Sequence, residues 1–142
     1  MKEHIRTLLL AAAVCGCTAA AANAADVKII ANPSVGASAI TVEEVKRVFL
    51  ITKTSLADGT HVEPVLSRSG AAHDAFLRDY LGKTDAALQT YYRSLVFTGK
   101  GSMPKALGSD AEVAAYVGKT QGAIGYVSTA ANVSGVKVLE LK

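Results

Sequence analysis

Short apolar runs rich in β-branched residues alternate along this chain with segments whose apolar residues recur every three or four positions. The first pattern predicts strands at residues 27–31, 62–66, 122–127 and 136–139. The second predicts helices at about residues 42–50, 71–81, 84–96 and 109–119. Alternation of strands and helices is typical of a sheet covered by helices, so we expect a three-layer α/β domain with a mixed or largely parallel sheet.

Polar residues at the predicted helix starts support these boundaries. Thr41 is followed three positions later by Glu44, which is the capping-box spacing, at the start of the first predicted helix. Thr84 and Ser109 are N-cap candidates for the two later helices, because their hydroxyls can accept a hydrogen bond from a free backbone N–H.

The first 24 residues have the pattern of a secretory signal peptide. Lys2 and Arg6 precede an apolar run at residues 8–14, and small residues continue to Ala22-Asn23-Ala24, a cleavage site of the A-x-A type. The apolar run is too short for a transmembrane helix, which needs about 20 apolar residues. We therefore expect a signal peptide at residues 1–24, one domain at residues 25–142 and a periplasmic location.

A second mode of processing stays open. Val14-Cys15-Gly16-Cys17 resembles a lipobox, in which Cys17 would be lipidated and become the first mature residue, changing the location but not the fold. Cys15 and Cys17 are the only cysteines of the chain, so cleavage after Ala24 would leave none. We then expect no disulfide, no thiol catalysis and no cysteine–zinc site.

The rest of the sequence contains no constellation typical of an enzyme, so we expect no catalytic residues, no metal and no cofactor. His61 and His73 have no metal-ligand spacing, and we expect both to be exposed, one on a turn and one on a helix. The formal net charge is only +3, and the chain has no basic run and no tryptophan. Nucleic acid is therefore not an expected partner.

The segment Ser67-Arg68-Ser69-Gly70 is the strongest candidate binding site, because it joins a predicted strand to a predicted helix. A guanidinium donates two parallel hydrogen bonds to an oxyanion, a hydroxyl donates another, and glycine lets the backbone come close to a ligand at the positive end of a helix. We expect Arg68, Ser69 and Gly70 to bind an oxyanion. The alternative is ordinary helix capping, with Arg68 solvated or paired with Asp74.

Two further serines are candidates for the same site. Ser34 and Ser38 lie in a loop of small residues after the first predicted strand. Because ligands of open α/β sheets gather at the carboxyl ends of strands, we expect both serines to line the edge that carries Arg68.

Motifs spread over most of the chain resemble the phosphate-binding subunits of ABC importers. They are Val48-Phe49-Leu50, the Asp58-Gly59 turn, Pro64-Val65 followed by Arg68-Ser69-Gly70, Phe76, Leu81, residues 91–101, residues 108–113 and the hexapeptide Gly122-Ala123-Ile124-Gly125-Tyr126-Val127. The hexapeptide is the most specific of these pieces. The later motifs are similar to short, single-lobe proteins of that superfamily.

This resemblance implies a single lobe of a type 2 periplasmic binding protein, with a mixed sheet flanked by helices. It also implies an exported solute-binding module that binds phosphate or another oxyanion, with importer membrane subunits or a periplasmic sensor protein as partners. Full-length members close two lobes around the ligand, whereas removing 24 of the 142 residues leaves 118, enough for about one. Ala71 and Ala72 stand where the family has further polar donors, so the affinity implied is low.

An interaction protein is the alternative from a different functional class. Such a lobe would dock on a periplasmic sensor or envelope protein without a small ligand. Tyr91, Tyr92 and Phe97 are candidate anchors for that surface, although aromatic residues at helical spacing more often belong to a core.

We predict that the mature protein begins near Ala25, because the A-x-A site is intact. Intact-mass spectrometry of the exported protein would measure this end directly. A diacylated N-terminal Cys17 would contradict the prediction.

Overall fold

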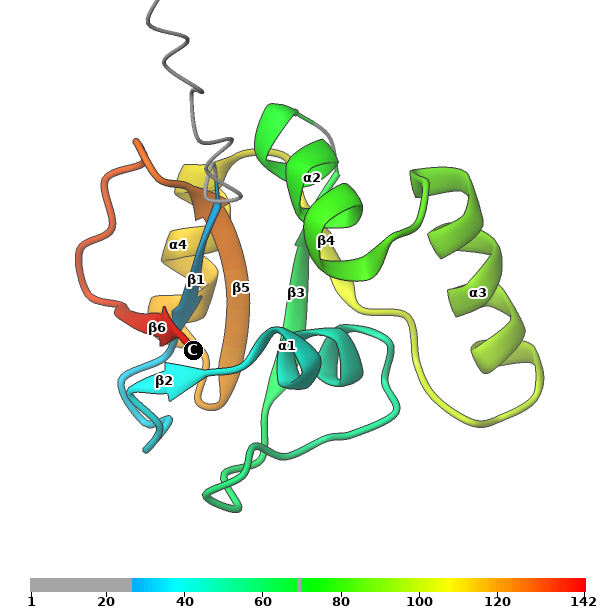
Figure 1. Ribbon diagram of the computed structural model, residues 1–142, viewed down its shortest axis with the longest axis horizontal. Coiled ribbons are helices and arrows are strands. Elements are labelled where there is room, and N and C mark those ends of the chain that lie inside the picture. Colours follow the sequence, from blue (N-terminus) through cyan, green and yellow to red (C-terminus); the bar gives the residue numbers. More distant parts are fainter. Residues whose placement is uncertain (1–26, 69) are drawn as a thin grey trace, which may run out of the picture.

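A six-stranded sheet lies between two layers of helices in the computed structural model, which describes residues 27–68 and 70–142 (Figure 1). The strand order is β2-β6-β1-β5-β3-β4. The strands are β1 (Val27–Ala31), β2 (Ala39–Ile40), β3 (Glu63–Ser67), β4 (Lys105–Leu107), β5 (Ala123–Ser128) and β6 (Lys137–Leu141). The predicted three-layer α/β fold with a mixed sheet is confirmed.

Helices cover both faces of this sheet. They are α1 (Val42–Phe49), α2 (Ala71–Phe76), which continues as a π-helical turn (Leu77–Leu81), α3 (Asp85–Phe97) and α4 (Asp110–Lys119). α1, α2 and α3 pack on one face through a core cluster that includes Phe49, Phe76 and Leu88, and α4 packs on the other face through Val113 and Val117. In Figure 1, α3 stands at the side of the domain, beyond α1 and α2.

The strand directions decide which loops share an edge. β3 runs parallel to both β4 and β5, whereas β1 is antiparallel to β5 and to β6. The carboxyl ends of β3, β4 and β5 therefore lie together at one edge, where β1 begins. The chain leaves β1 at the opposite edge.

Two strands were not predicted. β2 has two residues and β4 has three, which is too short to produce a recognisable alternation of polar and apolar residues. The predicted signal peptide at residues 1–24, the alternative lipidation at Cys17 and the Ser69 position all lie outside the described residues. Within the described ranges, no helix is long and apolar enough to cross a membrane.

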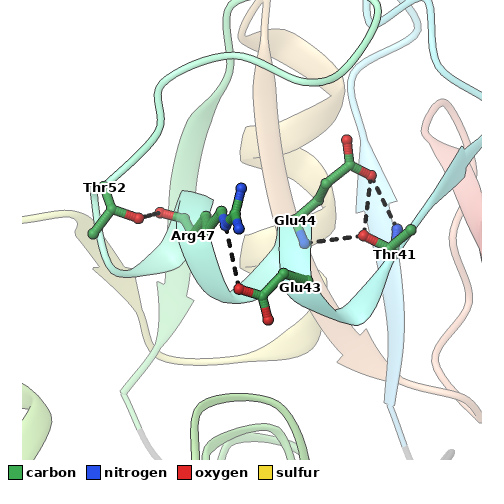
Figure 2. A network of polar contacts seen from close by, with 5 residues as sticks. All are labelled: Thr41, Glu43, Glu44, Arg47 and Thr52. Atoms are coloured by element: carbon green, nitrogen blue, oxygen red, sulfur yellow. Dashed lines mark hydrogen bonds and ion pairs between the residues drawn. The ribbon is translucent and has the colours of Figure 1, made fainter.

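The capping box predicted for α1 is present (Figure 2). The Thr41 hydroxyl accepts a hydrogen bond from the Glu44 backbone N–H at 3.1 Å, and the Glu44 carboxylate accepts one from the Thr41 N–H at 3.1 Å. Hydrogen bonds to the Glu44 carboxylate lower its pKa, with the one from the Thr41 backbone N–H as the largest cause. One turn further along α1, the Arg47 side chain forms an ion pair with Glu43 at 3.2 Å. The backbone carbonyl of Arg47 accepts a hydrogen bond from the Thr52 hydroxyl at 3.1 Å.

Gly125 sets how closely α4 approaches the sheet. A Cβ atom at this position would lie 3.0 Å from Val113 Cγ1 and 3.3 Å from Val117 Cγ2, both on α4. A side chain here would therefore push the helix away from β5. This close approach gives a physical reason for the second glycine of the hexapeptide motif.

We predict that Gly125→Ala destabilises the protein by about 1–3 kcal/mol, the usual cost of overpacking a filled core. Urea unfolding followed by circular dichroism would measure the change. Gly108→Ala is the control, because its added methyl group would meet only the end of the flexible Glu112 side chain, at 3.2 Å. Equal stability losses in the two variants would contradict the prediction.

Candidate functional site

The loop that carries Arg68 lies at the shared carboxyl edge of β3, β4 and β5. The Arg68 N–H donates to the Leu107 carbonyl at 2.8 Å, which extends the pairing of β3 with β4 by one residue. Gly70 has a φ of +111°, a conformation that side chains disfavour, and it is the N-cap residue of α2. This turn brings the chain from the end of β3 onto the face that α2 covers.

The Arg68 side chain is exposed and lines an open pocket of about 620 Å³ between β4 and α4. Tyr116 and Lys119 of α4 line the same pocket, and the Lys105 ammonium lies 5.0 Å from the centre of the Tyr116 ring. The alternative pairing of Arg68 with Asp74 is not formed, since no ion pair joins Arg68 to a carboxylate in the described part of the chain. The positive charge of Arg68 is therefore available to a ligand.

Glu112 is the one carboxylate among the described residues that line this pocket. Its Oε2 accepts a hydrogen bond from the Gly108 N–H at 2.8 Å, which holds the carboxylate against the loop between β4 and α4. Arg68 and Lys119 thus give the pocket lining a net positive charge. An anion entering the pocket would meet favourable electrostatics.

The prediction that Ser34 and Ser38 share the Arg68 edge was wrong. Because β1 is antiparallel to β5, the loop after β1 lies at the opposite edge. There the Ser34 hydroxyl accepts from the Gly122 N–H at 3.0 Å, just before β5 begins. Ser38 lines a separate pocket of about 460 Å³ together with Glu44 and Asp58.

The expectation that His73 is exposed was also wrong, whereas His61 is exposed as predicted. His73 retains 2% of its accessible surface, on the side of α2 that faces the sheet. Its Nδ1 lies 2.5 Å from the Tyr126 hydroxyl, and its Nε2 lies 2.9 Å from Asp85 Oδ1. The Tyr126 hydroxyl also accepts a hydrogen bond from the Ser67 N–H at 3.0 Å.

This chain of hydrogen bonds starts at Ser67, directly beside Arg68, and runs through Tyr126 and His73 to Asp85. Burial raises the pKa of Tyr126 well above its usual range, so its hydroxyl keeps its proton. The helical spacing of α2 could have indicated that His73 faces inward, because Ala72 and Phe76 are also buried there. No local pattern could have indicated its partners, which lie 53 residues away at Tyr126 and 12 residues away at Asp85.

Comparison with known proteins identifies the fold. Neither a protein-family model nor a curated protein matches the sequence. Solved structures do match, and each of the three described here covers 82% of this chain. One is described as a phosphate ABC transporter substrate-binding protein with bound phosphate, from Clostridium perfringens, with a TM-score of 0.61 and 16% identity.

Two further structures agree with it. An ABC-type phosphate transport receptor from Vibrio cholerae has a TM-score of 0.53 and 14% identity, and PstS from Borrelia burgdorferi has 0.59 and 16%. The chain spans less than half of the length of these structures, between 44% and 47%. The fold expected from the sequence motifs is thus confirmed, and the neighbours are described as binding and transport proteins.

Proposed function

We propose that this protein is a solute-binding module that binds phosphate or another oxyanion through Arg68, Ser69 and Gly70. The observation that carries this proposal is the exposed Arg68, which forms no ion pair with the residues that the structure describes, at the carboxyl edge of a fold that phosphate transport receptors share. One of those neighbours was solved with phosphate bound. Ligands of open α/β sheets gather at this kind of edge.

Each proposed ligand residue has a distinct chemical role. The Arg68 guanidinium donates paired hydrogen bonds and carries a permanent positive charge. The Ser69 hydroxyl donates one more. Gly70, which has no side chain, lets the backbone N–H groups at the start of α2 come close to the anion.

Arg68 and Gly70 are both exposed, and Gly70 is not among the residues that line the pocket, so this loop by itself encloses a ligand poorly. Exposed charges act through a medium of high dielectric constant, where the attraction between two unit charges 4 Å apart is only about 1 kcal/mol. The chain spans less than half of the Clostridium perfringens receptor, at 44% of its length. We therefore infer weak binding unless a further protein surface covers the loop that carries Arg68.

The remaining parts of the proposal concern location and partners. A signal peptide at residues 1–24 would export the domain at residues 25–142 to the periplasm. Importer membrane subunits or a periplasmic sensor protein would then be its partners, and it would act without catalysing a reaction. The solved structures with the same fold are described as a substrate-binding protein and a transport receptor, which supports a binding role over a catalytic one.

Exposure of Phe97 favours docking on a protein as a second candidate function. Tyr92 is buried at 1% exposure and donates its hydroxyl to the Phe49 carbonyl, and Tyr91 donates to the Leu50 carbonyl. These two tyrosines therefore attach α3 to α1. Phe97, at the end of α3, is 92% exposed, and Val96 beside it is 50% exposed. Exposed aromatic residues of this kind are typical interface anchors.

We predict that Arg68→Ala weakens phosphate binding at least tenfold, because removing a charged hydrogen-bond donor costs about 1.5–3 kcal/mol. The melting temperature should barely change, since exposed side chains contribute little to folding. Calorimetric titration with phosphate and sulfate would measure the affinity. Arg93→Ala, at an exposed arginine of α3 that does not line the pocket, is the matched control.

A wild-type protein that gives no heat with any tested oxyanion at millimolar concentration would refute the oxyanion proposal. Docking through Phe97 would then be the better-supported function.

We predict that a photo-cross-linking residue at position 97 forms one discrete adduct with an envelope protein in cells. The same residue at position 90, where Thr90 is also exposed on α3, should form none. Phe97→Ser should change stability by no more than about 0.5 kcal/mol, because the ring is outside the core. Equal adducts from both positions would count against a docking surface at Phe97.

A further inference from the structure

We propose that Tyr126, His73 and Asp85 are positioning residues for Arg68. Their hydrogen-bond chain fixes the backbone at Ser67 and thereby sets the direction in which Arg68 leaves the sheet. The inference rests on the proposed oxyanion function, in which none of the three residues touches the ligand.

The first link replaces a missing strand contact. The paired residues of β3 and β5 are Glu63 with Ala123 and Pro64 with Ile124, so the pairing stops before the end of β3. Beyond that point, the buried Ser67 N–H donates to the Tyr126 hydroxyl at 3.0 Å instead of to a strand carbonyl. A side chain of β5 thus holds the last residue of β3.

The next residue is held from the other side. The Arg68 N–H donates to the Leu107 carbonyl of β4 at 2.8 Å. Two successive backbone N–H groups are therefore fixed by the two strands that flank β3. Losing the Tyr126 contact would remove the hydrogen bond by which β5 holds this segment.

The remaining hydrogen bonds of the chain all have the same donor-to-acceptor order. The Tyr126 hydroxyl accepts from Ser67, and we assign its own proton to the contact with His73 Nδ1, which lies 2.5 Å away. A histidine ring whose Nδ1 accepts carries its proton on Nε2, which lies 2.9 Å from Asp85 Oδ1. Every group donates to the next, and the chain ends on a carboxylate. Aligned hydrogen bonds of this kind strengthen one another.

Packing alone does not require these polar groups. The Tyr126 ring stacks on Phe76 with centroids 3.9 Å apart, and a phenylalanine could make the same contact. Burying a hydroxyl and an imidazole is unfavourable unless every polar atom has a partner. The contact that only the tyrosine supplies is the one to the Ser67 amide.

The first experiment compares two buried tyrosines. Tyr126→Phe should weaken phosphate binding about tenfold, equivalent to one hydrogen bond of about 1.4 kcal/mol. It should also speed amide hydrogen exchange at Ser67 and Arg68. Tyr92→Phe is the matched control, because this tyrosine is equally buried but donates to the Phe49 carbonyl in α1. Its phosphate affinity should stay within about twofold of the wild type.

The second experiment uses Asp85, whose side chain is 53% exposed, so that its variants should fold. Asp85→Asn keeps an oxygen acceptor for His73 Nε2, whereas Asp85→Ala removes it. We expect Asn to retain most of the phosphate affinity and Ala to lose it. If Asp85 acted only through its negative charge at the start of α3, both variants would lose that charge and would bind phosphate with equal affinity. Nitrogen NMR of His73 should find Nδ1 unprotonated in the wild type and in Asp85→Asn.

The outcomes separate the two proposals. A wild-type protein that does not bind phosphate refutes the proposed function, and with it this inference. A wild-type protein that binds, with Tyr126→Phe binding as well as Tyr92→Phe, refutes the positioning role alone. If Tyr126→Phe does not fold, the comparison of Asp85→Asn with Asp85→Ala decides, and equal affinities refute the positioning role.

Discussion

The structure depends most on the position of the Tyr126 side chain, where the apolar core meets the hydrogen-bonded loop. Its ring packs against Phe76 and Phe49, with centroids 3.9 and 5.8 Å away, so that β5, α2 and α1 share one aromatic cluster. Its hydroxyl, at the other end of the ring, contacts Ser67 and His73. One side chain therefore contacts α1, α2 and the end of β3 at once.

Strand direction then decides what can become a site. Three parallel strands, β3, β4 and β5, end at one edge, and the loop with Arg68 leaves from there. β1 lies in the same sheet but runs the other way, so its small-residue loop serves the opposite edge. In that place Ser34 and Ser38 support the fold: Ser34 holds the turn before β5, and the Ser38 carbonyl accepts from Glu140 in β6. A serine-rich loop is thus a binding element only where the topology brings it to the right edge.

The two candidate surfaces are physically connected. Asp85 ends the chain that starts at Ser67, and it also lies in the first turn of α3, the helix that ends at the exposed Phe97. α3 is joined to the rest of the domain by this contact, by the buried side chains Leu88 and Tyr92, and by the Tyr91 hydroxyl. The helix that presents Phe97 is therefore tied to the loop that presents Arg68. This link explains why a half-exposed aspartate contacts a buried histidine.

The sequence by itself determined the features that depend on neighbouring residues. The spacing of apolar residues determined the four helices and the longer strands, and Thr41, Thr84 and Ser109 cap their helices as expected. From these the α/β class followed, because alternating strands and helices have few other ways to bury their apolar faces. The motifs around Arg68 and in residues 122–127 then predicted the particular fold, through their resemblance to binding proteins.

Only the tertiary structure decided the features that depend on distant residues. The reversed direction of β1, the short strands β2 and β4, and the contact of His73 with Tyr126 all come from pairings between segments far apart in the chain. A local pattern carries no information about such pairings, because the free energy that fixes them comes from burial and hydrogen bonds formed after the chain has folded back on itself. For that reason the position of Arg68 was predictable, whereas the residues that hold it in place were not.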